Sequence, residues 1–341
     1  MAPMIDKQNA KNNASLPLIP LQPLLESSPA TADIANGLLS AFQTEGFLYL
    51  TDFQSVIPPE MIEKVFTQSA GFFALPLKTK NVLEWSGPRA NRGYSSLGQE
   101  KNSLASTKEG VGIEREEIGD DLKESFEIGR EKEEGCPNLW PVNGWDEAFI
   151  FRSTMQDFFM RCKEIHKLLM RGVALAMGLN EAFFDGFVRT GDNTLRLLHY
   201  PEVAPGGFAG GKRVRAGAHS DYGSITLLFQ DSRGGLQVEH PSGGWLNVAP
   251  IEGTIVVNAG DLLTRWTNDL IRSTKHQVVE PPSPRPDGGH PARYSIAYFC
   301  NPDFDRNIEV LPGTWEGEKG GKKYTSVNSG DYLVQRLSAT Y

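Results

Sequence analysis

The sequence predicts an α+β fold: a double-stranded β-helix, or jelly roll, buttressed by N-terminal helices and a C-terminal helix. Long segments with apolar residues at helical spacing precede residue 180. After residue 190 the pattern changes to eight short extended runs bounded by turn residues, at 194–200, 214–219, 224–230, 235–239, 245–249, 254–258, 273–279 and 292–300. Many short strands with helices gathered before them are typical of a double-sheet jelly roll.

The N-terminal region, residues 16–145, is expected to contribute helices and strands that pack against this core. The preceding residues, 1–15, are polar and are expected to be disordered. Apolar spacing then predicts alternating strands and helices: a strand over 16–21, a helix over 31–44, a strand over 46–50 and a helix over 58–81. Residues 84–143 are rich in Gly, Pro and charge and are expected to be irregular. Their acidic run is expected to be a solvated helix face: Glu114, Glu116, Glu117, Asp120 and Asp121.

Residues 146–341 are expected to form one structural unit that contains the jelly roll and the catalytic site. Its first element is a long helix over 146–177, whose apolar residues repeat at three and four and form one stripe. Gly178 ends this helix, because glycine readily adopts the left-handed conformation that closes many helices. His166 lies on the helix and is interpreted as a surface or packed histidine. A final helix over 331–337 is expected to pack across the outside.

The composition excludes several kinds of partner. The formal charge is −8, so no basic patch for nucleic acid or an anionic membrane is expected. No stretch approaches the roughly 20 apolar residues that a membrane span needs. Three scattered cysteines suggest neither a disulfide framework nor a zinc ribbon. With no secretory signal pattern at the start, we expect a cytoplasmic protein. We expect it to bind a small-molecule substrate, and the sequence does not indicate its oligomeric state.

The pattern His-x-Asp, with a distant histidine, indicates a metal site. His219 and Asp221 are two apart, so on an extended segment their side chains point to one face. His276 lies on a later strand and can complete the set where a closed sheet brings the strands together. Two histidines and one carboxylate with open coordination positions are typical of non-haem Fe(II) oxygenases. These three residues are therefore the candidate iron ligands and catalytic residues.

A second group of side chains, on the last predicted strand, is suited to bind a carboxylate. Arg293 and Ser295 share one strand face, where a guanidinium and a hydroxyl can hold a carboxylate. On another strand Arg196 and Tyr200 share a face. A carboxylate clamp beside an iron site is what an enzyme with an oxo-acid co-substrate requires. A nearby basic segment is interpreted as a solvated loop, with a lid over the site as the alternative: Lys212, Arg213 and Arg215.

Further motifs accompany these two groups in order along the chain: Phe-Phe-Ala-Leu-Pro at 72–76, Arg-Gly-Tyr at 92–94, Gly-Gly-Leu-Gln-Val at 234–238, Trp-Leu-Asn-Val-Ala-Pro at 245–250 and Asn-Ala-Gly-Asp-Leu-Leu at 258–263. Over residues 16–341 the whole set resembles the Fe(II)/2-oxoglutarate dioxygenases related to isopenicillin N synthase. The resemblance implies a distorted jelly roll with dioxygen as the second co-substrate and ascorbate as a supporting reductant. It implies Fe(II) bound by His219, Asp221 and His276, and 2-oxoglutarate bound by Arg293, Ser295 and Tyr200. Leu198 departs from the Asn usual in plant members, so plant substrates are not carried over.

Within that family the chain resembles the fungal thymine 7-hydroxylases, through the stretches 127–131, 192–201, 230–238 and 332–341. Such enzymes oxidise the methyl group of thymine stepwise to the carboxylate. The resemblance implies a pyrimidine pocket lined by Asn193, Arg196, Tyr222 and Phe299. Two alternatives stay open: an oxygenase that tailors a different fungal heterocyclic or aromatic metabolite, by hydroxylation, desaturation or ring rearrangement, and a catalytically inactive jelly-roll binding protein.

Overall fold

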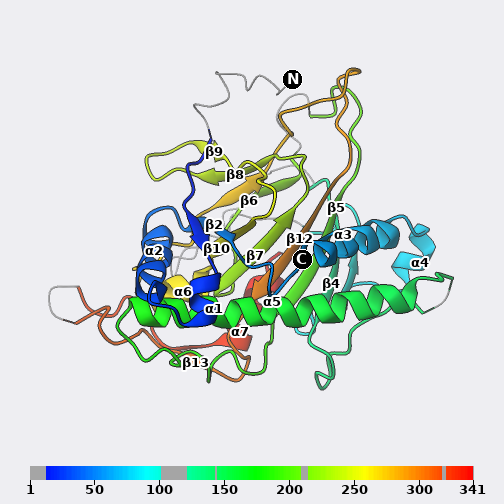
Figure 1. Cartoon of the computed structure of the whole chain (residues 1–341). Coiled ribbons are helices and arrows are strands. Elements are labelled where there is room, and N and C mark those ends of the chain that lie inside the picture. The colour runs from blue at the N-terminus through cyan, green and yellow to red at the C-terminus, as the bar shows by residue number, and fades with distance from the viewer. Residues whose placement is uncertain (1–12, 101–120, 143, 209–213, 317–319, 341) are drawn as a thin grey trace.

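Two β-sheets enclose the centre of the molecule in a computed structural model that describes residues 13–100, 121–142, 144–208, 214–316 and 320–340 (Figure 1). The larger sheet has eight strands, in the spatial order β1 (Leu18–Pro20), β2 (Phe47–Thr51), β10 (Ile255–Ala259), β7 (Ile225–Gln230), β12 (Arg293–Cys300), β5 (Thr194–Tyr200), β4 (Glu124–Gly129) and β3 (Gly93–Ser95). The smaller sheet has the order β6 (Ala216–His219), β11 (His276–Val278), β8 (Leu236–Glu239) and β9 (Trp245–Asn247). The predicted jelly roll is confirmed, and its eight predicted runs correspond to β5–β12.

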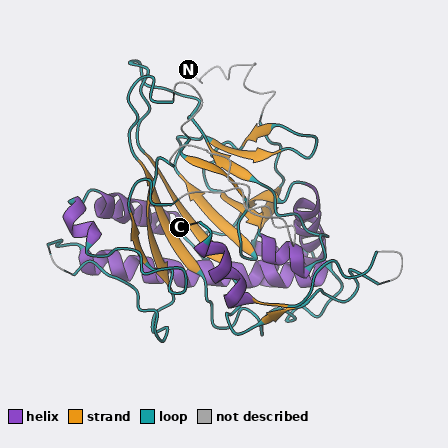
Figure 2. Ribbon diagram, turned by 180° about the vertical axis from the view of Figure 1, so that it is seen from behind, coloured by secondary structure: helices purple, strands orange, loops and turns teal. Residues whose placement is uncertain are grey.

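A layer of helices covers the outer face of the larger sheet (Figure 2). The helices of the described chain are α1 (Gln22–Glu26), α2 (Thr31–Thr44), α3 (Pro59–Phe73), α4 (Leu77–Asn81), α5 (Ala148–Ala176), α6 (Asp261–Trp266) and α7 (Ser329–Ser338). A separate short pair of strands, β13 (Asn307–Ile308) and β14 (Val327–Asn328), precedes α7. No helix of the described chain is both long and apolar enough to span a bilayer.

The long helix α5 runs along the sheet, with α2 and α3 packed against it (Figure 1). Its buried stripe includes Phe151, Phe158, Ile165 and Leu169, as the helical spacing predicts. Gly178 follows it with a φ of 71°, in the left-handed region expected for a helix-closing glycine. The predicted helix over 58–81 is instead two helices, α3 and α4, separated by a short turn that contains Pro76.

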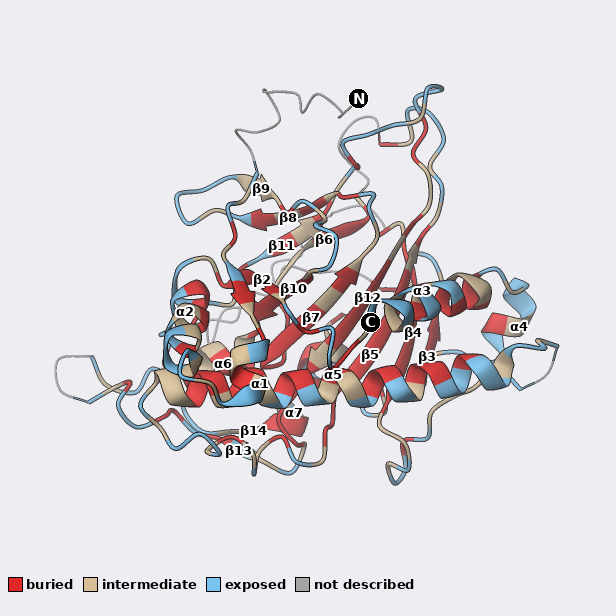
Figure 3. Ribbon diagram, viewed as in Figure 1, coloured by how far each residue is buried: buried red, intermediate tan, exposed pale blue. Residues whose placement is uncertain are grey.

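The two faces of the larger sheet pack against different layers, and alternate residues of its strands divide between them. One face forms a large apolar core with the helices, to which β5 and β12 contribute Leu195, Leu197, Ile296 and Tyr298. The other face forms a second core with the smaller sheet, to which the same strands contribute Leu198, Tyr200 and Ala297. Figure 3 shows the resulting burial along the strands of the sheet. The clamp and cavity side chains of β5 and β12 described below lie on this second, inner face, and His219 and His276 lie on the smaller sheet.

The expectation that residues 84–143 are irregular is wrong, because β3 and β4 lie within them. β4 pairs with β5 from Glu124↔His199 to Gly129↔Thr194, and each of its residues is buried. The strand was missed because its sequence, Glu-Ser-Phe-Glu-Ile-Gly, contains two carboxylates at buried positions. Glu124 lies 2.7 Å from Lys80 Nζ, an ion pair that compensates for its burial.

Two more expectations for the N-terminal region meet the structure in part. Residues 1–12 lie outside the described chain, but Ala14 donates a backbone hydrogen bond of 2.8 Å to Asn247 O, so the end of the expected disordered segment is ordered. The acidic run also lies mostly outside the described residues. Its last member, Asp121, is buried and not part of a solvated face. Strands from both 16–145 and 146–341 form the larger sheet, so the two regions share one core.

Candidate active site

Three side chains that can bind a metal meet between β6, β11 and the loop after β6. His276 of β11 pairs directly with His219 of β6, and Asp221 lies two residues after His219. The Nε2 atoms of His219 and His276 lie 3.9 and 3.7 Å from Asp221 Oδ1. The ligand atoms of the three residues all lie within 4.8 Å of one another. Strand pairing therefore brings together the residues that the sequence predicts as iron ligands.

Hydrogen bonds orient the two imidazole rings. The Nδ1–H of His219 donates to Gly217 O at 2.7 Å, and that of His276 donates to Thr274 O at 3.3 Å. Both Nε2 atoms are thereby left for a metal. Burial, reinforced by the charge of His276, lowers the pKa of His219 to about 4. The ring is therefore neutral near pH 7, which is the form that binds metals.

The carboxylate of Asp221 is oriented in the same way. Its Oδ2 accepts hydrogen bonds from Thr226 Oγ1 at 2.6 Å and Asn258 Nδ2 at 2.7 Å, which leaves Oδ1 directed at the two histidines. Burial raises the pKa of Asp221, but the neighbouring imidazoles and these hydrogen bonds outweigh burial, and the net pKa lies below its usual value. Two imidazoles and one ionised carboxylate oxygen form a donor set that fits Fe(II).

Two glycines allow the loop that carries Asp221 to fold tightly. A Cβ atom on Gly223 would lie 2.4 Å from Cys300 O, and one on Gly260 would lie 2.4 Å from Gly223 O. The backbone of Asp261 also donates to Asp221 O at 2.8 Å. Larger residues at the two glycines would push this loop away from the histidines, so the Gly-Asp sequence at 260–261 positions the site as well as turning the chain.

The predicted carboxylate clamp forms on the inner face of the larger sheet. Arg293 pairs with Tyr200 across β12 and β5, and its guanidinium carbon lies 4.9 Å from the centre of the tyrosine ring. Arg293 Nη1 donates to Ser295 Oγ at 3.1 Å, and Nε donates to Gly234 O at 3.1 Å. Arg293 and Ser295 are each 1% exposed. The structure thus brings together all three residues predicted to bind the co-substrate.

Arg215, the described member of the predicted basic segment, is not solvated as expected. Lys212 and Arg213 lie outside the described residues, whereas Arg215 is fully buried. Its guanidinium carbon lies 5.9 Å from the ring centre of Tyr200, on which Arg293 also packs. The sequence pattern around Arg215 does not reveal this, because three basic residues close together are usually solvated.

A cavity of about 740 Å³, its open mouth included, extends from the metal-binding residues. Three of the four predicted substrate residues line it, namely Arg196, Tyr222 and Phe299. Phe299 lies under the Arg196 guanidinium, at 5.3 Å from its carbon. Apolar side chains of α7, Leu333 and Leu337, line the cavity too. The cavity therefore combines aromatic and apolar surfaces with a small number of charged groups, as small-molecule sites commonly do.

The fourth predicted substrate residue, Asn193, does not line the cavity. Its side chain donates to the Tyr298 hydroxyl at 2.9 Å and accepts from Asn301 N at 2.8 Å, on the helical side of the sheet. The next residue, Thr194, lines the cavity in its place. Alternation along the strand accounts for the difference, because Thr194 and Arg196 share a face and Asn193 does not.

A charged wall made of Glu100, Lys123, Arg196 and Glu127 lies beside the cavity. Arg196 Nη1 lies 3.0 Å from Glu100 Oε1, and Arg196 Nε lies 2.8 Å from Glu127 Oε1. Lys123 Nζ is 3.3 Å from Glu100 Oε2 and 3.0 Å from Asp121 Oδ2. Glu100 and Lys123 line the cavity and were not identified from the sequence, because they lie outside every periodic element that it predicts.

The two carboxyls of the charged wall differ in protonation. Burial alone would raise the pKa of Glu100, but the charges of Arg196 and Lys123 hold it down at about 2. Burial raises the pKa of Glu127 to about 7, against the opposing charge of Arg196. The carboxylate that faces the cavity is therefore ionised, and the one behind Arg196 titrates close to neutral pH.

The C-terminal helix holds the aromatic residue next to the metal site. The hydroxyl groups of Tyr222 and Thr340 share a hydrogen bond of 2.7 Å. The Arg336 guanidinium lies 4.4 Å from the Tyr222 ring centre, and its Nη2 lies 3.1 Å from Asp261 Oδ2. These contacts tie α7 and the residues that follow it to the loop that carries the metal-binding carboxylate.

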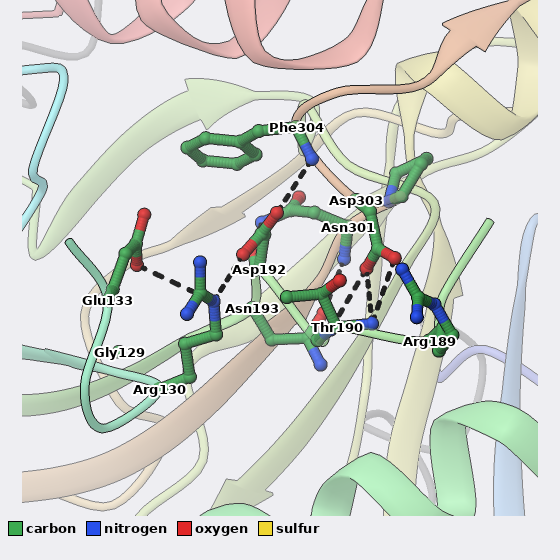
Figure 4. Close-up of polar contacts among 12 residues, drawn as sticks. Gly129, Arg130, Glu133, Arg189, Thr190, Asp192, Asn193, Asn301, Asp303 and Phe304 are labelled. Atoms are coloured by element: carbon green, nitrogen blue, oxygen red, sulfur yellow. Dashed lines mark hydrogen bonds and ion pairs between the residues drawn. The ribbon is translucent and has the colours of Figure 1, made fainter.

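Buried carboxylates connect segments next to β5 and β12 (Figure 4). Asp192 accepts from Arg130 Nε at 2.6 Å and from the backbone of Phe304 at 2.7 Å. Asp303 accepts from the backbone N–H groups of Thr190 and Gly191 at 2.8 to 2.9 Å. The segments before β5 and after β12 are thus joined, and they present Thr194, Asn301 and Phe304 to the cavity.

Two protein-family models match the chain. The model of the 2OG-Fe(II) oxygenase superfamily matches residues 191–302, and a model of the N-terminal region of a non-haem dioxygenase in morphine synthesis matches residues 16–143. A proline hydroxylase of Petromyces alliaceus is 37% identical over 308 residues, which cover 89% of this chain and 92% of that protein. The chain belongs to the 2OG-Fe(II) oxygenase superfamily. It is a 2-oxoglutarate-dependent non-haem iron dioxygenase, and Fe(II) and 2-oxoglutarate are its cofactor and co-substrate.

Solved structures of other 2OG-Fe(II) oxygenases superpose on this one over nearly the whole chain. The thymine 7-hydroxylase of Neurospora crassa, in complex with 2-oxoglutarate and thymine, is 48% identical with a TM-score of 0.85 and 99% of each chain covered. A 2OG-Fe(II) oxygenase family protein of Caulobacter crescentus is 28% identical with a TM-score of 0.79, covering 96% of this chain and 100% of that one. These similarities confirm the predicted resemblance to the fungal thymine 7-hydroxylases.

Proposed function

We propose that this dioxygenase oxidises the methyl group of thymine, stepwise through the hydroxymethyl and formyl compounds to the carboxylate. The observation that carries the proposal is the cavity, in which aromatic faces and ionised edge groups lie next to the iron-binding residues. The thymine 7-hydroxylase of Neurospora crassa, 48% identical, has been solved both with thymine and with 5-formyluracil, and this supports the choice of ring.

In this proposal His219, Asp221 and His276 hold Fe(II), and Arg293, Ser295 and Tyr200 hold 2-oxoglutarate. Bound Fe(II) and 2-oxoglutarate would supply the oxidant from dioxygen, with release of CO2 and succinate. This oxidant would replace a substrate C–H hydrogen by a hydroxyl group. The protein's contribution is to position the substrate methyl group and to exclude water. No acid or base of the chain is required to remove the hydrogen, so orientation of the substrate decides where oxidation occurs.

The residue types of the cavity suit a flat, neutral ring with both carbonyl and N–H groups at its edge. Phe299 and Tyr222 offer ring faces for stacking. Arg196 and Lys123 can donate hydrogen bonds to carbonyl oxygens, and the ionised Glu100 can accept from an N–H group. A pyrimidine such as thymine presents both kinds of edge. An apolar substrate could form no hydrogen bonds with these charged groups and would bind poorly beside them.

The proposal is tested by incubating the protein with Fe(II), 2-oxoglutarate and ascorbate, with and without thymine. We expect thymine to accelerate succinate formation, and mass spectrometry to show thymine gaining oxygen in steps. Substituting Phe299 by Ala is expected to raise the KM for thymine roughly tenfold, because a stacking contact and its apolar area are lost. Phe149→Ala is the matched control, since Phe149 is 81% exposed on α5. Equal succinate formation with and without thymine would exclude this substrate.

A second candidate function is the oxidation of another fungal metabolite. Relatives of similar coverage carry varied descriptions: besides the proline hydroxylase, a 2-oxoglutarate-Fe(II) type oxidoreductase of Metarhizium rileyi is 37% identical over 295 residues. The same assay with free proline and with larger heterocycles separates the candidates. A compound that raises succinate formation more than thymine does, and is itself oxidised, would favour this second function.

A further inference from the structure

Arg215 is a buried cation at the co-substrate end of the site. It directly precedes β6, and its backbone N–H donates to Val278 O at 2.9 Å. Its side chain is 0% exposed. Its guanidinium carbon and that of Arg293 lie 5.9 and 4.9 Å from the ring centre of Tyr200. Two guanidinium groups therefore converge on one tyrosine, and neither of them lines the cavity assigned to the substrate.

The protein satisfies only part of the hydrogen-bonding capacity of Arg215. Its Nη2 donates to Pro291 O at 2.7 Å, whereas its Nε and Nη1 are buried without a partner among the described residues. No carboxylate of the described chain lies within 4.0 Å of the guanidinium. Gln230, which pairs with Ser295 across β7 and β12, likewise has a buried Nε2 without a partner. All of these unpaired atoms are N–H donors, so the group that satisfies them must supply acceptors.

The electrostatics at this position lead to the same kind of ligand. Burial, and then the charge of Arg293, lower the pKa of Arg215 to about 10, although Tyr200 and Asp231 act in the opposite direction. Even so, Arg215 stays charged at neutral pH. Two buried cations close together are unfavourable unless an anion lies between or beside them. A carboxylate, with two oxygens that accept several hydrogen bonds, fits this requirement.

We propose that Arg215 is a second guanidinium for the distal carboxylate of 2-oxoglutarate, acting together with Arg293 and Ser295. It would make the site select an oxo acid that has two carboxylates over one that has a single carboxylate. The inference depends on the use of 2-oxoglutarate, which the family membership establishes, and not on the identity of the oxidised substrate. It assigns Arg215 to co-substrate binding and leaves the metal-binding residues unchanged.

The test compares two oxo acids in equilibrium binding. Isothermal titration calorimetry without dioxygen measures the Kd of 2-oxoglutarate and of 2-oxopentanoate, which has a methyl group in place of the distal carboxylate, on the Fe(II)-loaded protein. For Arg215→Met we expect the Kd of 2-oxoglutarate to rise roughly 10- to 100-fold, as for loss of a hydrogen bond to a charged group. The Kd of 2-oxopentanoate is expected to change less than about threefold, because that ligand never contacts the lost charge.

Arg189→Met is the matched control, since Arg189 is exposed and its backbone carbonyl accepts from Lys163 of α5, on the helical side of the sheet. It should leave both Kd values unchanged. If Arg215→Met weakens both ligands by the same factor, Arg215 supports the fold of the site and the proposal is overturned. An unchanged Kd for 2-oxoglutarate overturns it as well.

A second variant covers the case in which Arg215→Met does not fold. Arg215→Lys keeps the positive charge but has fewer donors and a shorter reach. Its preference for 2-oxoglutarate over 2-oxopentanoate, expressed as the ratio of the two Kd values, should fall below that of the unsubstituted protein. A ratio that equals the unsubstituted value would overturn the proposal. Because the ratio is measured on one sample, the fraction of folded protein does not affect it.

Discussion

The two faces of the larger sheet use the same strands for different purposes. On the helical face, β5 and β12 present Leu197 and Ile296 to a continuous apolar core. On the inner face the same strands present Arg196, Arg293 and Ser295, all buried and all polar. Neighbours in sequence therefore serve different layers. A one-residue change of register would direct the carboxylate clamp into the helices and the apolar side chains into the site, so the apolar face also fixes the position of the chemistry.

This contrast suggests that changes on the helical face should affect mainly stability, and that changes on the inner face should affect mainly activity. The following substitutions test that separation, beginning with the largest expected effect.

Substituting Asp221 by Ala should abolish 2-oxoglutarate turnover, by at least roughly a thousandfold, because the metal contributes several kcal/mol to the reaction and one of its ligands is lost. Iron content and succinate formation are the measurements. Asp157→Ala, on the outer side of α5, is the control and should behave as the unsubstituted protein. Wild-type-like succinate formation by the Asp221 variant would refute the assignment of the iron site.

Substituting Leu197 by Ala should lower the free energy of unfolding by about 2–5 kcal/mol, because the side chain is fully buried in the core shared with the helices. The kcat and KM of the folded enzyme should stay within about twofold, as the removed atoms face away from the site. Urea unfolding and steady-state kinetics provide the two measurements. Leu77→Ala, at a side chain 56% exposed, should cost less than about 0.5 kcal/mol. A large kinetic effect at Leu197 would show that the two faces are not separable.

Substituting His166 by Gln should weaken the pH dependence of stability. Burial lowers the pKa of His166 to about 3, whereas an unfolded histidine titrates near 6.5. Between these values the unfolded chain binds more protons, so stability falls as pH falls below about 6.5. Removing the imidazole should therefore reduce the loss of unfolding free energy between pH 7 and pH 5, measured with urea. Equal losses in both proteins would assign that pH dependence to other groups.

The inner face explains why the sequence predicts some functional residues and not others. Arg293 and Ser295 lie on one strand, where a spacing of two residues places their side chains on one face, and His219 ends β6 two residues before Asp221. The family resemblance places Asn193 in the pocket. Asn193 and Arg196 are three positions apart, however, and on a strand an odd spacing directs two side chains to opposite faces. For this residue, alternation along the strand predicts the orientation better than the family resemblance does.

Residues brought to the cavity from outside the predicted strands leave no periodic pattern. Glu100 and Lys123 flank residues 101–120 and reach the site through ion pairs with Arg196 and with each other. Burial of charge depends on partners that are distant in sequence, and these partners become visible only in three dimensions. The same reason accounts for β4, whose buried carboxylates made a central strand resemble a loop.

The position of α7 has a consequence for incomplete chains. A stop codon after residue 328 would leave every iron-binding and clamp residue in place but remove Leu333, Leu337 and Thr340 from the cavity. Such a fragment would be able to activate dioxygen without holding a substrate in position. Consumption of 2-oxoglutarate would then no longer be matched by oxidised substrate, so α7 determines how tightly the two halves of the reaction are coupled.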